Sequence, residues 1–316
     1  MMIYLGKRLG MIAAVLLILM VFLGGLIHLV PGDPVKIIMG PLASDSFAAS
    51  VRSEMGLDKP IAIQMLDFIF GAVHGDLGKD FVSHRPVTVM IGGVLPHTMI
   101  LAVTGLGLAI LIGLPLGVYS AVHANSAIDK AIASVSITLI TLPPYVAGLL
   151  LLLTFAVTLA WLPALGAGNF SAPLDYAARL ILPSLALALG WIGYLARLTR
   201  ASMLEILGAN YVRTARSFGL SDTRIHYLYA LRSAVIPVVA VLGVGLGHLL
   251  GGAIFIEVIF GRQGLGTLFY DAIATRNFPV IRGVAVVVAT LFVVTNLLAD
   301  LSYRLLDPRI RVEAKT

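Results

Sequence analysis

The chain has 316 residues, of which 59% are hydrophobic and 12% are charged, and its formal net charge at pH 7 is +6. Soluble proteins carry about 25% charged residues, so this chain has too few polar side chains to cover a water-facing surface, and its composition indicates an integral membrane protein. The sequence contains no cysteine, which excludes disulfide bonds, thiol catalysis and cysteine-bound metals.

Six apolar segments are long enough to cross a bilayer, which requires about 20 residues of helix. They lie at about 9–30, 98–122, 132–161, 177–196, 234–259 and 280–306. The first is too long for the apolar run of a signal peptide, so we expect a retained helix. The third contains Pro143 and Pro144, which predict a kink or break there. The expected fold class is therefore all-α, a polytopic membrane protein with six transmembrane helices.

The distribution of positive charge predicts the orientation. If residues 1–8, 123–131, 197–233 and 307–316 lie on one side, together with Asp300 and Arg304 at the end of the last span, that side carries 13 Lys and Arg against 6 Asp and Glu. The other side then carries 9 against 10. The positive-inside rule then places both termini in the cytoplasm. This asymmetry is a membrane feature, so the net positive charge gives no reason to expect a nucleic-acid partner.

The orientation divides the chain into four parts. We expect an N-terminal transmembrane helix at 1–30, a periplasmic cap or docking segment at 31–97, a core of five helices at 98–306 and a cytoplasmic tail at 307–316. The stretch "AIQMLDFIFGAV" within 31–97 predicts a helix in the cap.

The spans lack the residues that drive a stand-alone transporter. Glu257 and Asp300 lie near span ends, where we expect them to pair or to reach the interface, and no series of Asp, Glu or His crosses the middle. A phosphate-binding loop is also missing, because the best candidate, Gly78-Lys79, lacks the first glycine. No hydrolase motif occurs either. A stand-alone channel or secondary carrier and an intramembrane enzyme are therefore the disfavoured alternatives, and the energy for any transport should come from a partner.

Small residues recur in the fifth span. Gly243, Gly247 and Gly251 are spaced by four, which is typical of a ridge where another backbone approaches closely. The ridge could serve packing within the chain, or it could lie near a subunit interface or a translocation path. Gly113 and Gly117 form a weaker case, because a proline lies between them.

The cytoplasmic segment 197–233 has a helical pattern. Tyr211, Ala215 and Phe218 share one helix face, and Arg213 and Arg216 lie toward another. The segment could be a positive loop against anionic lipid, or a rigid projection presented to a cytoplasmic protein.

A turn follows this helix. Gly219 is placed to end it with a positive φ, and Ser221 is placed to cap a second helix that begins with Asp222. That helix should carry Ile225, Leu228 and Leu231 on one side, and it should end before the next span.

The same segment carries a family resemblance. The pattern Ala215-x-x-x-Gly219, followed by Ala230-Leu231 and Ile236-Pro237, resembles the cytoplasmic loop signature of ABC-transporter permeases. Motifs along the whole chain, among them "LVPGDP", "GDLG", "GLPLGV" and "NLLADLSYRLLDPRIR", are similar to the first permease of the dipeptide/oligopeptide/nickel import family.

The resemblance implies a type I ABC importer permease fold with cytoplasmic coupling helices, in a bacterial inner membrane. It implies a second homologous permease, two cytoplasmic ATPases that use ATP-Mg, and an outer solute-binding protein, whereas this chain is not an enzyme and binds no cofactor. Peptides are the expected cargo, with nickel, opines, glutathione or sugar-like solutes as alternatives. The implied coupling residues are Tyr211, Arg213, Thr214, Ala215, Gly219, Leu220, Ser221 and Arg224.

Overall fold

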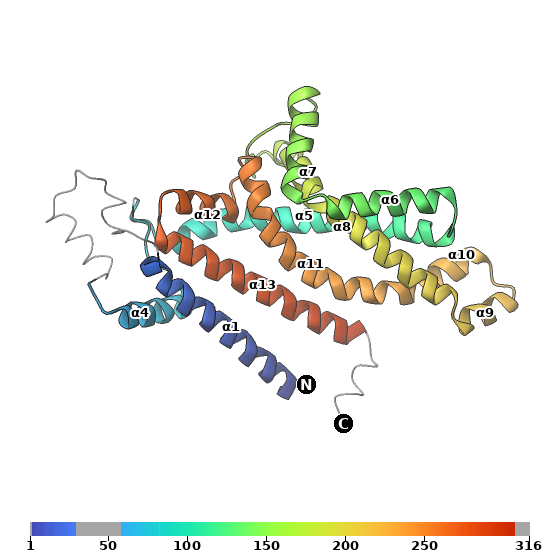
Figure 1. Cartoon of the computed structure of the whole chain (residues 1–316), viewed down its shortest axis with the longest axis horizontal. Helices are drawn as coiled ribbons and strands as arrows, with labels where there is room; N and C mark the ends of the chain where they lie inside the picture. The colour runs from blue at the N-terminus through green and yellow to red at the C-terminus, as the bar shows by residue number, and fades with distance from the viewer. Residues whose placement is uncertain (1, 30–57, 82, 307–316) are drawn as a thin grey trace. The chain divides into compact units, whose positions relative to one another are not determined.

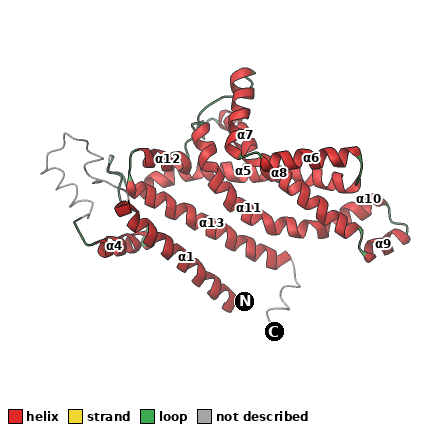
Figure 2. Cartoon of the chain, viewed as in Figure 1, coloured by secondary structure: helices red, strands yellow, loops and turns green. Residues whose placement is uncertain are grey.

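The computed structural model describes residues 2–29, 58–81 and 83–306. Residues 31–57 and 82 of the expected cap and the whole tail at 307–316 lie outside this range. The described residues form helices and no strand, with one isolated bridge between Lys79 and Pro86 (Figure 2). The expected all-α class is confirmed.

The helices follow one another along the chain as Figure 1 labels them. They are α1 (Met2–Leu29), α4 (Ile61–Val73), α5 (Val87–Val122), α6 (Ala127–Thr141), α7 (Pro144–Leu151), the π-helix η1 (Leu152–Thr158), α8 (Pro173–Leu207), α9 (Asn210–Ser217), α10 (Asp222–Arg224), the π-helix η2 (Ile225–Ala230), α11 (Leu231–Ile259), α12 (Leu265–Ala274) and α13 (Phe278–Leu306).

Five helices of the described chain are long and apolar enough to cross a membrane, and the bent pair α6 and α7 brings the number to six. The pair bends by 103° at Pro143 and Pro144, which confirms the expected break. Several helices extend beyond their apolar runs: α5 begins at Val87, and α8 continues to Leu207. At the end of α8 the charged residues end the apolar run without ending the helix, because Arg and Glu are good helix formers.

The chain forms two compact units, of which the first contains residues 1–96 and 263–293. Its core gathers buried side chains from the start of α5, from α12 and from the start of α13, among them Val87, Leu265 and Val284. The expected cap helix is α4, which packs against α1 where Gly24 leaves room for the side chain of Met65.

The second unit contains residues 97–262 and 294–316, and α8 is its centre. α8 packs against α6, α7 and α11, and it also lies very close to α5. A Cβ atom at Gly117 would lie 2.6 Å from the carbonyl oxygen of Ala196 and 2.6 Å from the Cβ of Thr199. Gly113 meets α8 in the same way, 2.8 Å from the carbonyl oxygen of Ile192. The pair that looked weaker in the sequence therefore makes one of the closest helix contacts of this unit.

Candidate functional site

The loop between α8 and α11 is ordered by its own backbone. α9 ends at Ser217, and Gly219 follows with a φ of +77°, as the sequence predicts. The Gly219 N–H donates to the Arg216 carbonyl at 3.0 Å, and the Leu220 N–H donates to the Ala215 carbonyl at 3.4 Å. These bonds close the end of α9 and turn the chain sharply toward α10.

The buried side of α9 differs from the face that the sequence groups together. Val212 is fully buried and Ala215 is 8% exposed, so these two residues anchor the helix. Tyr211 is 47% exposed and Phe218 is 81% exposed, although both lie on the same helix face as Ala215. Two large aromatic side chains thus point outward from a short anchored helix.

In the second half of the loop the structure differs from two predictions. Ser221 has the extended backbone of an N-cap, but its side chain makes no capping hydrogen bond. Residues 225–230 are π-helical, so α-helical spacing does not apply, and Ile225 is fully buried while Leu228 is 64% exposed. The prediction that these two share one side is therefore wrong.

The expected stop before the membrane is absent as well. α10, η2 and α11 follow without a break, and residues 222–259 are one candidate span. The loop is therefore a short helix, a glycine turn and the extended start of a long membrane helix, as Figure 1 shows for α9, α10 and α11.

The other predicted loop residues form an exposed surface. Arg213, Thr214 and Arg224 are exposed, and Leu220 is partly buried. Arg216 and Asp222 bridge the turn with an ion pair of 3.6 Å. Both partners are well exposed, so this pair adds little stability. We call the exposed residues Tyr211, Arg213, Thr214, Arg216, Phe218 and Arg224 the loop surface.

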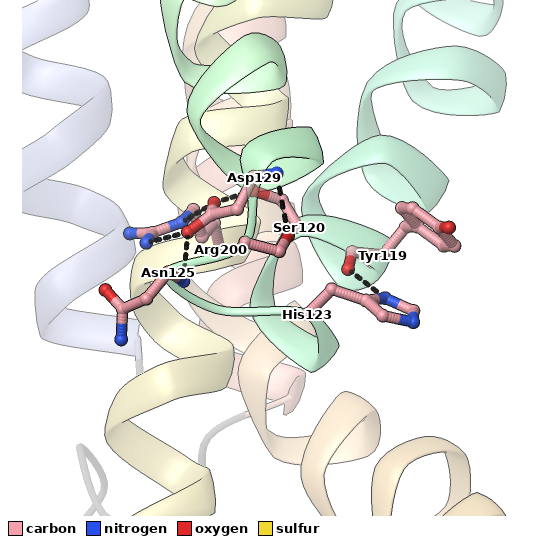
Figure 3. A network of polar contacts seen from close by, with 7 residues as sticks. Tyr119, Ser120, His123, Asn125, Asp129 and Arg200 are labelled. Atoms are coloured by element: carbon pink, nitrogen blue, oxygen red, sulfur yellow. Dashed lines mark hydrogen bonds and ion pairs between the residues drawn. The ribbon is translucent and has the colours of Figure 1, made fainter.

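A polar network supports the helix that carries this loop (Figure 3). Arg200 binds both carboxylate oxygens of Asp129, with its Nε 2.6 Å from Oδ1 and its Nη2 2.7 Å from Oδ2. The Ser120 hydroxyl donates to Oδ1 at 2.5 Å, and the Asn125 N–H donates to Oδ2 at 2.8 Å. The Asp129 N–H in turn donates to the Ser126 hydroxyl at 3.1 Å.

This network joins three helices at one point. Ser120 lies near the end of α5, Asp129 in the first turn of α6, and Arg200 near the end of α8. The Asp129 side chain is 4% exposed, so four donors satisfy a carboxylate that is almost withdrawn from solvent. The bidentate geometry fixes the position of the guanidinium as well as its charge. The end of α8, and with it the start of the loop, is therefore held to α5 and α6.

The sequence does not predict this network. Asp129 and Arg200 are assigned there only to the connections between spans. Ser126-x-x-Asp129 is a helix-start signature and could have predicted where α6 begins. The partner of Asp129 lies 71 residues away, and no local pattern indicates it.

A second polar cluster joins α5 to the start of α8 and to the end of α11. Thr98 donates to the fully buried Glu257 at 2.6 Å, so the expected pairing of this carboxylate is confirmed. Tyr176 accepts from Arg262 at 2.7 Å and lies 3.1 Å from the Nδ1 of His97. Buried polar groups of this kind pair with one another and hold the helix ends together.

The glycines of α11 do not share one environment. A Cβ atom at Gly243 would lie 1.9 Å from the Cβ of Ala299, so this residue serves packing within the chain. Gly247 is buried, whereas Gly251 is exposed and faces open space. The packing interpretation therefore fits Gly243, and Gly251 remains available to a path or an interface. Within the described residues, no group of three or more His, Asp or Glu could hold a metal ion.

Curated relatives match the chain over nearly its whole length. A glutathione transport system permease protein of Salmonella choleraesuis is 37% identical over 308 residues, 98% of each chain. A probable peptide ABC transporter permease protein of Sinorhizobium fredii is 34% identical over 310 residues, 98% of this chain and 99% of the relative. A putative peptide transport system permease protein of Brucella abortus is 37% identical, over 97% of this chain and 98% of the relative.

The fold has solved counterparts. The MetNI methionine ABC transporter in an inward-facing conformation matches 69% of this chain and 96% of its own, with a TM-score of 0.58 and 17% sequence identity. Residues 1–102 match the family model for the N-terminal part of binding-protein-dependent transport system membrane components, and residues 113–312 match the model for the inner membrane component itself. The chain belongs to the family of binding-protein-dependent transport system inner membrane components.

Proposed function

We propose that this chain is one of two homologous permease subunits of an ATP-driven bacterial importer and that it forms half of the translocation path. Family membership over the whole chain is the observation that carries this proposal. A binding-protein-dependent system needs a solute-binding protein outside and two ATPases inside. ATP-Mg is used by those ATPases, and this chain serves as the non-enzymatic membrane subunit.

The loop surface is the proposed contact with an ATPase. Its helix is anchored by Val212 and Ala215, its turn is closed at Gly219, and the aromatic rings of Tyr211 and Phe218 point outward. A protein groove can bind such projecting aromatic side chains, because they bury a large area at a low cost in conformational entropy. When the ATPases close, their motion would reach α8 and α11 directly, since the loop connects these two helices.

The proposed orientation follows from charge. Both termini and the loop surface lie in the cytoplasm, and the cap segment 31–97 lies outside, where it receives the binding protein. The positive-inside rule supports this orientation. Anionic lipid at the inner surface would contact the arginines that the ATPases leave uncovered.

Short peptides are the proposed cargo. The relatives named above are described as glutathione and peptide permeases, and glutathione is itself a modified tripeptide. Nickel and opines remain the alternatives within the same architecture.

Uptake by the reconstituted transporter tests this function. Proteoliposomes that contain both permeases and the ATPases should accumulate a radiolabelled tripeptide only when the binding protein is outside and hydrolysable ATP is inside. Liposomes that contain this chain alone are the control and should take up nothing. Uptake by this chain alone without ATP would contradict the proposal, and uptake of nickel in place of peptide would contradict the cargo.

A further inference from the structure

A cavity of about 500 Å³ lies in the second unit, between the break of α6 and α7 and the helices α8 and α11. Sites for small organic ligands have volumes of about 300–1,000 Å³, and this open cavity falls within that range. Its wall includes Ile140 and Pro144 from the break, Trp191 and Tyr194 from α8, and His248 and Gly252 from α11.

The break supplies hydrogen-bond acceptors beside this cavity. In an α-helix each carbonyl accepts from the N–H four residues later, but for Leu139 and Ile140 those residues are Pro143 and Pro144, which carry no N–H. Both carbonyls also belong to the last turn of α6, the negative end of its dipole. This wall therefore favours a ligand group that donates hydrogen bonds or carries positive charge.

An aromatic surface lies on the α8 side of the cavity. A Cβ atom at Gly245 would lie 2.8 Å from two ring carbons of Trp191, so the glycine makes room for the indole and limits its movement. The ring of Tyr194 meets the indole edge-on, with centroids 5.6 Å apart. Aromatic faces attract ammonium groups and N–H donors.

His248 gives the α11 side a polar group. It is the sole ionisable residue of the sequence between Arg232 and Glu257. Ionisable residues inside spanning helices usually face a cavity and mark substrate pathways. An imidazole can donate a hydrogen bond to a carboxylate or to an amide carbonyl.

We propose that this cavity is a transit site for a short peptide with a free amino terminus. The α-ammonium group lies toward the carbonyl end of α6 and the aromatic pair, and a carboxylate or amide carbonyl lies toward His248. None of the described residues that line the cavity is acidic, which suits a zwitterionic peptide better than a metal cation. This inference rests on the proposed function, because it assigns a site to the proposed cargo.

Photo-crosslinking tests the site without relying on transport. The membrane complex of permeases and ATPases, without the binding protein, is irradiated with the tripeptide Ala-photoleucine-Ala, and the adducts are mapped by mass spectrometry. We expect adducts in the segments 139–144, 191–194 or 248–252. The same tripeptide with an acetylated amino terminus should give fewer adducts, because it lacks the ammonium group.

Substitutions provide the matched controls. Trp191→Ala should lower the adduct yield by roughly threefold to tenfold, the range expected for the loss of one aromatic contact, and Trp191→Phe should retain most of it. Trp161→Ala removes the only other tryptophan of the chain, which is 69% exposed and does not line the cavity, and should leave the yield unchanged.

The possible results distinguish a failure of the proposed site from a failure of the proposed function. If the wild-type transporter accumulates peptide with ATP but its adducts lie outside these three segments, the site is wrong and the function stands. The site is also overturned if Trp191→Ala and Trp161→Ala behave alike, or if crosslinking shows that a side chain of the second permease fills the cavity. If the wild-type transporter accumulates no peptide at all, the proposed cargo fails and the site fails with it.

Discussion

Reversing the charge of Arg200 is expected to abolish peptide uptake and to lower the yield of assembled transporter strongly. Arg200→Glu would place a second carboxylate against Asp129, whose side chain is almost fully buried, and would remove both hydrogen bonds of the bidentate pair. The end of α8 would lose its attachment to α5 and α6, and the loop would no longer be held in place. Copurification with the ATPases and uptake in proteoliposomes measure the two effects.

Two further variants make this prediction specific. Arg200→Lys keeps the charge but cannot bind both oxygens in the same way, so an intermediate loss is expected. Arg197→Glu reverses a charge on an exposed residue of the same helix and should be tolerated far better. If Arg200→Glu and Arg197→Glu lower assembly and uptake equally, the network has no special role.

The glycine contact between α5 and α8 should be sensitive to any added side-chain volume. In Gly117→Ala the new methyl group would lie 2.6 Å from a backbone carbonyl of α8, so the two helices must separate. Overpacking of this kind typically costs about 1–3 kcal/mol. Thermal unfolding of the purified transporter, followed in detergent, should show a lower midpoint.

Gly107→Ala on the same helix is the matched control. A Cβ atom there would meet nothing within 4 Å, so no clash arises. Alanine is a better helix former than glycine by about 0.8–1.0 kcal/mol, so this variant should be neutral or slightly stabilised. Equal midpoints for the two variants would show that α5 and α8 are not packed as closely as described.

Sequence reasoning was most successful where the cause is local. Membrane-length apolar runs predict the spanning helices, because the bilayer sets their length. Two adjacent prolines predict the break between α6 and α7, because they remove backbone donors. The sequence predicts a positive φ at Gly219, and its φ is +77°.

Features that depend on distant residues could not be predicted. Asp129 and Arg200 meet across 71 residues, and nothing near either residue indicates the other. The environment of each glycine depends on the facing helix: Gly243 and Gly117 both meet close neighbours, whereas Gly251 meets open space. The cavity could not be predicted for the same reason, since its wall combines residues of four helices, α6, α7, α8 and α11.

The buried face in the second half of the loop could not be predicted for a different reason. The predicted faces over residues 225–230 assume the spacing of an α-helix, and the π-helical turns change which side chains share a face. A pattern analysis assumes the period before it assigns the faces. Here the period itself changes within the loop, so Ile225 is buried and Leu228 is not.

The central claim is that the loop surface docks onto an ATPase, and a single introduced thiol tests it most directly. The chain has no cysteine, so Phe218→Cys gives a unique thiol at the most exposed aromatic position of the loop, and Thr275→Cys gives a control on a predicted outer connection. Each is labelled with a maleimide that carries a photoreactive group, in the assembled transporter. We predict that Phe218→Cys yields an adduct between this chain and an ATPase subunit and that Thr275→Cys yields none. An assembled, transporting complex in which Phe218→Cys gives no ATPase adduct would contradict the claim.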